Sequence, residues 1–316
     1  MTDGPAPSAD RHVRIYEVGP RDGLQNEPTP IPTEEKVRFV ELLVAAGLRE
    51  IEATSFVSPR AIPQLADAAE LLPALPELTG VRYPVLVPNL RGMARAEAAG
   101  ADALAVFTAT TDAFTEHNIG LTVADSLDAF APVLERAGEL GWWRRAYVSA
   151  AFGCPYTGRV DPGRAVEVAL ELLELGADEI CFGDTIGVGV PDQVTDLTER
   201  ATAAGVHLDR LAYHFHDTRG TALANVSAGL AVGVRCFDAS TGGIGGCPYA
   251  PGASGNLATE DLVYLLDAEG WQHGVRLDGV LAAARSIAAA LGRPLVSKVG
   301  QAGGWDPLTG AATARA

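Results

Sequence analysis

Short runs of β-branched and other apolar residues alternate along this chain with longer stretches rich in Ala, Leu and Glu. The short runs are typical of strands and the longer stretches of helices. We predict strands over residues 12–18, 48–53, 81–87, 102–107, 144–151, 177–183, 209–216 and 234–240. We predict helices near residues 33–46, 61–72, 90–99, 122–140, 162–175, 191–204, 220–232, 259–268 and 278–291.

Cap residues support several of these helix boundaries. Glycine follows the last helical residue in four places, where a left-handed residue commonly ends a helix: Gly47, Gly100, Gly176 and Gly205. We expect Thr33 to cap the first helix, although Lys36 stands where a capping box requires an acidic residue.

Eight strand–helix units with short connections favour an α/β fold of the (β/α)8 TIM-barrel type, with an additional C-terminal helical segment at 278–291. A doubly wound open sheet is the alternative, but no Gly-x-Gly-x-x-Gly follows the first predicted strand. We expect one catalytic domain over residues 12–300, between flexible tails at 1–11 and 301–316.

Length and charge narrow the class of protein further. A chain of 316 residues suits a single barrel, and its apolar fraction of 47% is ample for a large core. No apolar run reaches the roughly 20 residues that a membrane span needs. The net charge of −16 argues against nucleic acid as a partner. It also means that local arginines, a metal ion or backbone N–H groups must hold any anionic substrate.

The four cysteines lie far apart and contain no Cys-x-x-Cys pair, which fits a reduced compartment rather than a disulfide framework. The first ten residues have neither a basic start nor an apolar core, so no signal peptide is predicted. We therefore expect a cytoplasmic protein.

The segment His214-Phe215-His216 carries the clearest chemical signal. It lies in an alternating run that reads as a strand, so both imidazoles project from one face, about 7 Å apart. Two such imidazoles can bind one divalent metal ion. Asp217, Thr218 and Gly220 follow directly and mark the carboxyl end of that strand, where α/β folds place their active sites.

Other polar residues follow the remaining predicted strands. The first strand leads to Arg21, Asp22 and Gln25, the second to Glu52 and Ser55, and the sixth to Asp184 and Thr185. The eighth leads to a glycine-rich loop with Cys247, followed by Asn256. In a barrel these side chains converge on one rim.

Each of these residues has a structural explanation when taken alone. Asp22 and Asn256 are common turn residues, Glu52 could pair with an arginine, and Asp184 could cap a helix. Cys247 could be a small buried apolar residue, as we expect of Cys154, Cys181 and Cys236. Their convergence on one rim favours a functional site. Oxygen and imidazole donors without a thiolate favour Mg²⁺ or Mn²⁺, and a thiol in a mobile loop suits proton transfer.

These motifs together resemble the 3-hydroxy-3-methylglutaryl-CoA (HMG-CoA) lyase family. The resemblance runs from residue 14 to about 270, and the matching stretches lie at 18–27, 54–59, 153–156, 183–189, 214–218, 245–250 and 255–261. It implies a barrel enzyme, a carbon–carbon lyase that cleaves HMG-CoA to acetyl-CoA and acetoacetate. An acyl-CoA would be its small-molecule partner, and a homodimer is a further expectation.

The resemblance also implies roles for individual residues. Asp22, His214, His216 and Asn256 would bind the divalent cation, with Glu52 nearby. Arg21 would polarise the thioester carbonyl, Asp184 or a histidine such as His214 would take a proton, and Cys247 would act from a flexible loop. The predicted contacts to substrate are Arg21, Gln25, Ser55, Thr185 and Asn118.

Pro28 departs from the family pattern, which often has Lys there, so a basic contact to the CoA phosphates at this position is in doubt. Three other functions remain open. One is a lyase for a differently 3-substituted 3-hydroxyglutaryl-CoA, and one is a Claisen-condensing synthase, although such enzymes usually have Asn where this chain has Asp217. The third is a barrel that only binds metal and CoA esters, against which Arg21, Asp184 and Cys247 argue.

Overall fold

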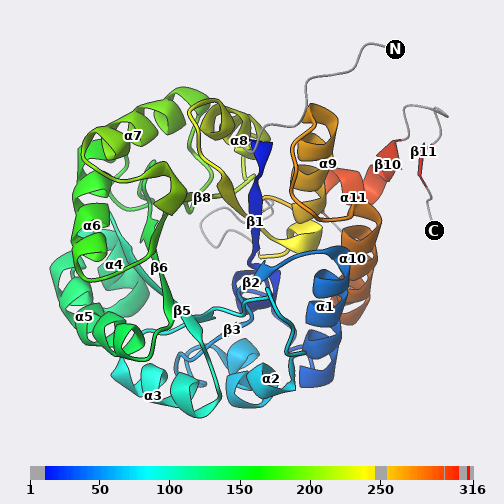
Figure 1. Cartoon of the computed structure of the whole chain (residues 1–316), viewed down its shortest axis with the longest axis horizontal. Coiled ribbons are helices and arrows are strands. Elements are labelled where there is room, and N and C mark those ends of the chain that lie inside the picture. Colours follow the sequence, from blue (N-terminus) through cyan, green and yellow to red (C-terminus); the bar gives the residue numbers. More distant parts are fainter. Residues whose placement is uncertain (1–10, 246–254, 295, 306–311, 314–316) are drawn as a thin grey trace.

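The computed structural model describes residues 11–245, 255–294, 296–305 and 312–313. Its main sheet contains parallel strand segments surrounded by helices (Figure 1). The segments are β1 (Arg14–Glu17), β2 (Glu50–Ile51), β3 (Thr54–Ser55), β4 (Val85–Leu86), β5 (Ala103–Ala109), β6 (Trp143–Ser149), β7 (Glu179–Asp184), β8 (Leu211–Phe215) and β9 (Cys236–Ala239).

The sheet closes on itself. Its order is β2-β1-β9-β8-β7-β6-β5-β4-β3, so β2 and β3 stand at opposite ends of the order. They are nevertheless consecutive in the chain, separated by Glu52 and Ala53, and are two pieces of one strand. The described segments therefore form the eight strands of a closed barrel. The predicted (β/α)8 fold is confirmed, and closure rules out the open doubly wound sheet.

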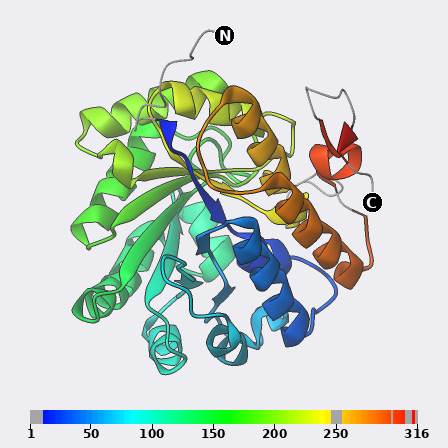
Figure 2. The same ribbon diagram turned by 45° about the vertical axis from the view of Figure 1, so that its right-hand side comes forward.

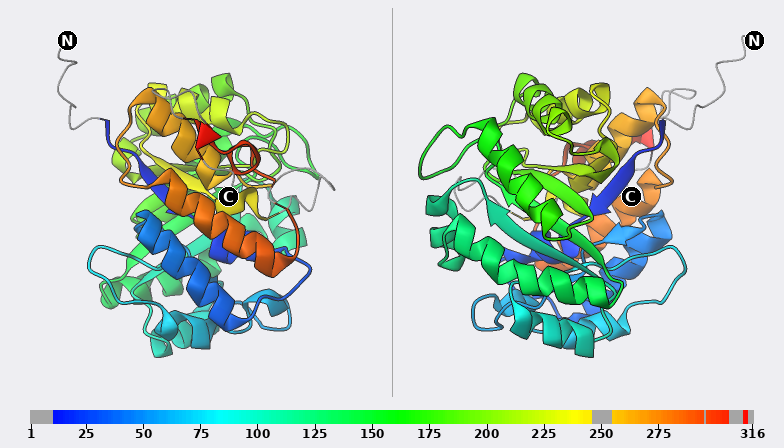
Figure 3. Two further views of the ribbon diagram at one scale, coloured as in Figure 1. Left: turned by 90° about the vertical axis from the view of Figure 1, so that its right-hand side faces the viewer. Right: turned by 60° about the vertical axis from the view of Figure 1, so that its left-hand side comes forward.

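Nine helices of the described residues correspond to predicted ones, lie outside the strands and bury their apolar faces against them (Figures 1 and 2). They are α1 (Thr33–Ala46), α2 (Ala68–Ala74), α3 (Leu90–Ala98), α5 (Val123–Glu139), α6 (Pro162–Glu174), α7 (Pro191–Ala203), α8 (Ala222–Ala231), α9 (Thr259–Glu269) and α10 (Leu277–Leu291). Each overlaps a predicted helix, although α2 begins at Ala68 where the prediction placed its start near residue 61, and α10, the predicted additional segment, packs outside the barrel against α1 (Figures 2 and 3).

Several details differ from the prediction. A short helix that the sequence did not predict, α4 (Asp112–Ile119), follows β5, and a π-helical turn, η2 (Gly19–Gly23), follows β1. Beyond α10 the chain adds α11 (Lys298–Ala302), and two short strands, β10 (Gly304–Trp305) and β11 (Ala312–Thr313), pair within the segment predicted as a tail.

The predicted cap at Thr33 is wrong. Pro32 holds the N-cap position, and Thr33 is already helical, with its hydroxyl donating to Asp67 at 2.9 Å. Lys36 also makes tertiary contacts. Its buried ammonium group donates to Asp67 at 2.7 Å and to the carbonyl of Gln64 at 2.6 Å. The polar residues of this first turn therefore join α1 to the segment before α2.

The glycine boundaries and the buried cysteines agree with the prediction. Gly47, Gly100, Gly176 and Gly205 all have positive φ. Cys154, Cys181 and Cys236 are buried free thiols. No helix among the described residues is long and apolar enough to cross a membrane.

Gly47 provides a test of the packing between α1 and the segment before α10. Its φ is +111°, and an added Cβ would lie 2.2 Å from the carbonyl oxygen of Gly274, whereas the same atom at Gly100 (φ +82°) meets nothing within 4 Å. We expect Gly47→Ala to cost roughly 2–4 kcal/mol of unfolding free energy and Gly100→Ala about 1 kcal/mol. Urea unfolding of both variants measures the difference, and equal losses would contradict the close approach.

Candidate active site

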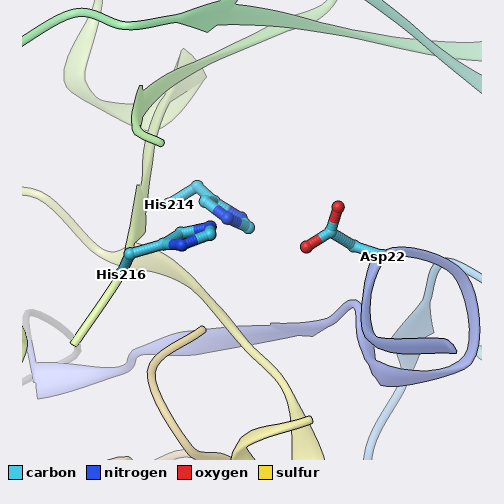
Figure 4. Close-up of side chains that lie close together, drawn as sticks. All are labelled: Asp22, His214 and His216. Carbon is cyan, nitrogen blue, oxygen red and sulfur yellow. The ribbon is translucent and has the colours of Figure 1, made fainter. Parts of the chain in front are cut away.

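Strand β8 and the residue directly after it present two imidazoles to the inside of the barrel. His214 and His216 are both buried, and their ring centroids lie 5.1 Å apart. The alternation of strand side chains puts both rings on one face, with the apolar Phe215 between them on the other. Figure 4 shows both rings directed toward Asp22.

The π-helical turn η2 supplies Asp22. This turn directly continues β1, and π-helical geometry of this kind is frequent at functional sites. Ligand-type atoms of Asp22, His214 and His216 all lie within 4.8 Å of one another. Two strands far apart in the sequence thus bring a carboxylate and two imidazoles together at the carboxyl ends of the barrel.

Asn256 completes this arrangement. It forms an isolated bridge with His216, and its side-chain Nδ2 donates to Asp22 Oδ2 at 2.7 Å and to the carbonyl of Ile244 at 3.2 Å. Gly245 permits this approach, since its φ is +94° and a Cβ there would lie 2.6 Å from Asn256 Nδ2. The amide is therefore held against the carboxylate that faces the imidazoles.

Two polar atoms of this cluster fit a metal ion. His216 Nδ1 and Asn256 Oδ1 are buried and have no hydrogen-bond partner among the described residues. An unpaired buried polar atom is costly, so two of them in one cluster indicate a missing partner. The four residues offer imidazole nitrogen, carboxylate oxygen and amide oxygen, a donor set that suits a divalent cation.

The electrostatics of the cluster keep two of its donors unprotonated, whereas the hydrogen bond to Asp238 raises the pKa of His214 above its ordinary value despite burial. Burial alone would raise the pKa of Asp22, but Arg21 and the two imidazoles outweigh it and lower the pKa to about 2. Burial, together with the neighbouring His214, lowers the pKa of His216 to about 3. Asp22 is therefore ionised and His216 neutral near pH 7, the forms in which both can bind a cation.

Glu52 lies beside the cluster and holds Arg21. Its carboxylate is fully buried and accepts hydrogen bonds from the Nε of Arg21, from Tyr16 at 3.0 Å and from Tyr147 at 2.6 Å. Arg21 also donates through Nη1 to Asp22 at 2.9 Å. The structure does not bring Glu52 into the group of metal-ligand atoms, so its contacts favour a role in orienting the guanidinium.

Asp184 ends β7 on the same rim. Its oxygens accept hydrogen bonds from the backbone N–H groups of Val188 and Gly189, both at 2.9 Å. Burial raises the pKa of Asp184 above its ordinary value, although these two donors oppose the shift. The carboxyl group is thus held by its own loop and has an increased affinity for a proton.

The predicted substrate contacts lie in different environments. Gln25 and Thr185 are half-buried, and Asn118 is exposed in the last turn of α4. The Thr185 hydroxyl accepts from the backbone N–H of Ala150 at 3.1 Å. Ser55 is fully buried, and its hydroxyl bonds the carbonyl of Leu86 and the N–H of Val57, which argues for a structural role instead of substrate contact. Cys247 lies outside the described residues.

Three residues around the site were not predicted from the sequence. Glu17 is fully buried and accepts from the hydroxyls of Thr241 and Thr259, which stand on either side of the glycine-rich loop. Arg145 and Asp238 pair inside the barrel at 2.6 Å. Arg145 and Asp238 stand inside the apolar strands β6 and β9, and a charged residue at such a position was the available signal, whereas Glu17 ends β1.

Fold and site together define a (β/α)8 barrel with an Asp/His/His/Asn cluster at the carboxyl ends of its strands. A family model described as HMGL-like matches residues 12–287. The chain belongs to this family.

Named relatives are similar over nearly the whole chain. It is 48% identical over 292 residues to the mitochondrial hydroxymethylglutaryl-CoA lyase of Bos taurus, an alignment that covers 92% of this chain and 90% of that one. It is 49% identical to hydroxymethylglutaryl-CoA lyase of Pseudomonas mevalonii, covering 92% and 96% of the two chains. The crystal structure of the Pseudomonas aeruginosa hydroxymethylglutaryl-CoA lyase matches with a TM-score of 0.90 and 46% identity over 92% of this chain and 97% of that chain.

His216 provides the direct test of the cluster as a metal site. Replacing it with Ala removes one of two imidazoles, so we expect Mn²⁺ affinity, measured by titration calorimetry, to fall below detection while the circular dichroism spectrum is retained. His207→Ala, at an exposed histidine outside the barrel, is the matched control and should bind Mn²⁺ as the unmodified protein does. Unchanged affinity in His216→Ala would remove this residue from the ligand set.

Proposed function

We propose that this protein is a divalent-metal-dependent carbon–carbon lyase that cleaves HMG-CoA to acetyl-CoA and acetoacetate. One observation carries the proposal: Asp22, His214, His216 and Asn256 lie together beside the buried Arg21. They do so at the carboxyl ends of the strands, where barrel enzymes have their active sites. Membership of the HMGL-like family and the lyase names of its close relatives support the same substrate and reaction.

The metal ligands that we assign are Asp22, His214, His216 and Asn256, and the ion is Mg²⁺ or Mn²⁺. Ligand type supports this assignment, because oxygen and imidazole donors are present and none of the four is a thiolate. When bound, a divalent cation would polarise the oxygen atoms of the substrate and lower the pKa of a coordinated hydroxyl. Asp22 and Asn256, hydrogen-bonded to one another, hold the oxygen donors of the site in place.

Cleavage of the C2–C3 bond requires that the 3-hydroxyl of the substrate lose its proton. We assign Asp184 as the base that accepts this proton, because His214 and His216 are assigned as metal ligands. Its carboxyl group is buried, so its raised pKa brings it closer to the operating pH than an exposed aspartate. The two backbone N–H donors fix its orientation while leaving lone pairs on both oxygens.

The same step leaves negative charge on the thioester oxygen, as the enolate of acetyl-CoA. Arg21 is the fixed cation that we assign to this charge. Glu52 and Asp22 engage its Nε and Nη1, so we assign the Nη2 donors to the substrate. A guanidinium held in advance by a buried carboxylate stabilises developing charge without reorganisation in the transition state.

The acetyl-CoA enolate must finally receive a proton, and Cys247 remains our proposed donor. Gln25, Thr185, Asn118 and Arg21 remain the proposed contacts to substrate. An Acinetobacter baumannii HMG-CoA lyase, solved in complex with coenzyme A and 3-methylmalate, matches this chain with a TM-score of 0.90 and 36% identity. That complex supports a CoA thioester as the substrate class. A cytoplasmic location and a homodimer also remain predictions.

The proposed function is tested by incubating the purified protein with HMG-CoA and Mg²⁺ and measuring acetoacetate. The same assay, with other substrates, distinguishes this lyase from two related enzymes. We expect acetoacetate in equimolar amount to acetyl-CoA, abolished by a chelator and restored by added Mg²⁺ or Mn²⁺. Turnover of only a longer 3-substituted analogue would favour a lyase of different chain-length preference. Consumption of acetyl-CoA with an oxo acid would favour a condensing synthase. If no thioester were turned over, the proposal that this protein is a thioester-cleaving enzyme would be wrong.

Arg21 tests the proposed enolate stabilisation. We expect Arg21→Met to lower kcat with a loss of roughly 3–5 kcal/mol of transition-state stabilisation, because a preorganised charge is removed. Arg285→Met, at an exposed arginine of α10, is the control and should be unaffected.

Arg21→Met also leaves Glu52 buried without its cation, which could destabilise the fold. The double variant Arg21→Met/Glu52→Gln removes both charges and should show the same low kcat with a recovered unfolding midpoint. A kcat near that of the unmodified protein in either variant would refute the assigned role.

A further inference from the structure

A row of buried charges crosses the inside of the barrel and ends on His214. Asp238 stands beside His214 in the register of β8 and β9, and its Oδ2 lies 3.1 Å from the Nδ1 of that imidazole. Its Oδ1 accepts from Nη2 of Arg145 at 2.6 Å. Arg145 Nε in turn lies 3.2 Å from Glu179 Oε1, an ion-pair distance. Asp238, Arg145 and Glu179 are all buried.

This row fixes the charge of Asp238. Two carboxylates and one guanidinium lie together away from water, and the guanidinium also packs on the ring of Tyr16 at 3.7 Å from its centroid. An isolated buried carboxylate would be very costly, so Arg145 is the group that keeps Asp238 ionised in this position. An ionised carboxylate only accepts hydrogen bonds.

The consequence for His214 is a single tautomer. Since Asp238 accepts, Nδ1 of His214 must carry the proton, and the neutral ring then presents the lone pair of Nε2 on its opposite side. His216 differs, because its Nδ1 has no hydrogen-bond partner among the described residues. One imidazole of the pair is therefore oriented by the barrel interior and the other is not.

We propose that Asp238 is a positioning residue for the metal site, which holds His214 in the Nδ1–H tautomer with Nε2 directed at the cation. Carboxylate–histidine–metal chains of this kind tune ligand orientation and basicity in metal centres. The inference rests on the metal site proposed above. The competing explanation is that Asp238 serves only as the counter-ion of Arg145, with its contact to His214 incidental.

The first measurement needs no substitution at Asp238. In the metal-free full-length protein at pH 8, long-range ¹⁵N–¹H spectra of the histidine rings report which nitrogen carries the proton. The signals of His214 are identified by their loss in His214→Asn. We expect the proton on Nδ1, where it can be donated to Asp238. A ring that carries its proton on Nε2 alone would overturn the proposal.

The second measurement uses Asp238→Asn, which keeps the size of the side chain and removes its charge. We expect Mn²⁺ affinity by calorimetry to fall by roughly 10–100-fold and the His214 ring to lose its single tautomer. Cys181→Ala is the matched control, since the Cys181 thiol contacts the same Oδ2 at 3.7 Å and is not part of the proposed chain. It should change Mn²⁺ affinity by less than about twofold.

The outcomes separate the two proposals. If the unmodified protein binds no Mn²⁺, the metal site itself fails, whatever Asp238 does. If it binds Mn²⁺ and Asp238→Asn binds equally well with an unchanged tautomer, only the positioning role fails. If Asp238→Asn does not fold, as the loss of a partner for Arg145 could cause, the tautomer of the unmodified protein decides.

Discussion

Charged groups buried inside a closed barrel are the constraint on which the rest of this structure depends. A barrel interior excludes water, so each charge there needs a partner within hydrogen-bonding or ion-pair distance. The interior meets this need with connected groups. Glu52 holds Arg21, which reaches Asp22, and Glu179 lies beside Arg145, which holds Asp238 and through it His214. Both rows end on residues of the candidate metal site.

In this organisation, hydrogen bonds hold some residues of the site, while other residues of the site have buried atoms without a partner among the described residues. Arg21, Asp22 and His214 are oriented by groups deeper in the barrel, so little conformational entropy is left to lose when a ligand binds. His216 Nδ1 and Asn256 Oδ1 instead have no partner among the described residues. A cation bound there would satisfy atoms that the fold leaves unsatisfied, which is the physical case for the proposed lyase chemistry.

Much of the fold could be predicted because its signals are local. The bounds of α1 agree with the prediction at both ends, and Gly47, Gly100, Gly176 and Gly205 have the positive φ expected after a helix. The error at Thr33 instead has a non-local cause. Thr33 was predicted as the cap because its side chain suits that role, but its hydroxyl donates to Asp67, which is distant in sequence, and the helix begins at Thr33 with Pro32 as an N-cap that has no side-chain hydrogen bond.

The sequence by itself determined the alternation that makes a barrel, and the residues that end its strands, including the His214–His216 pair and Asp22. Parallel strands carry their carboxyl ends to one rim, so a linear pattern is enough to predict which residues meet there. Only the tertiary structure decided which contacts these side chains make. Glu52 holds Arg21, the Ser55 hydroxyl bonds the backbone, and Asp238 faces His214. Such pairings depend on the register between strands and on the twist of a closed sheet, and the sequence of a single segment determines neither.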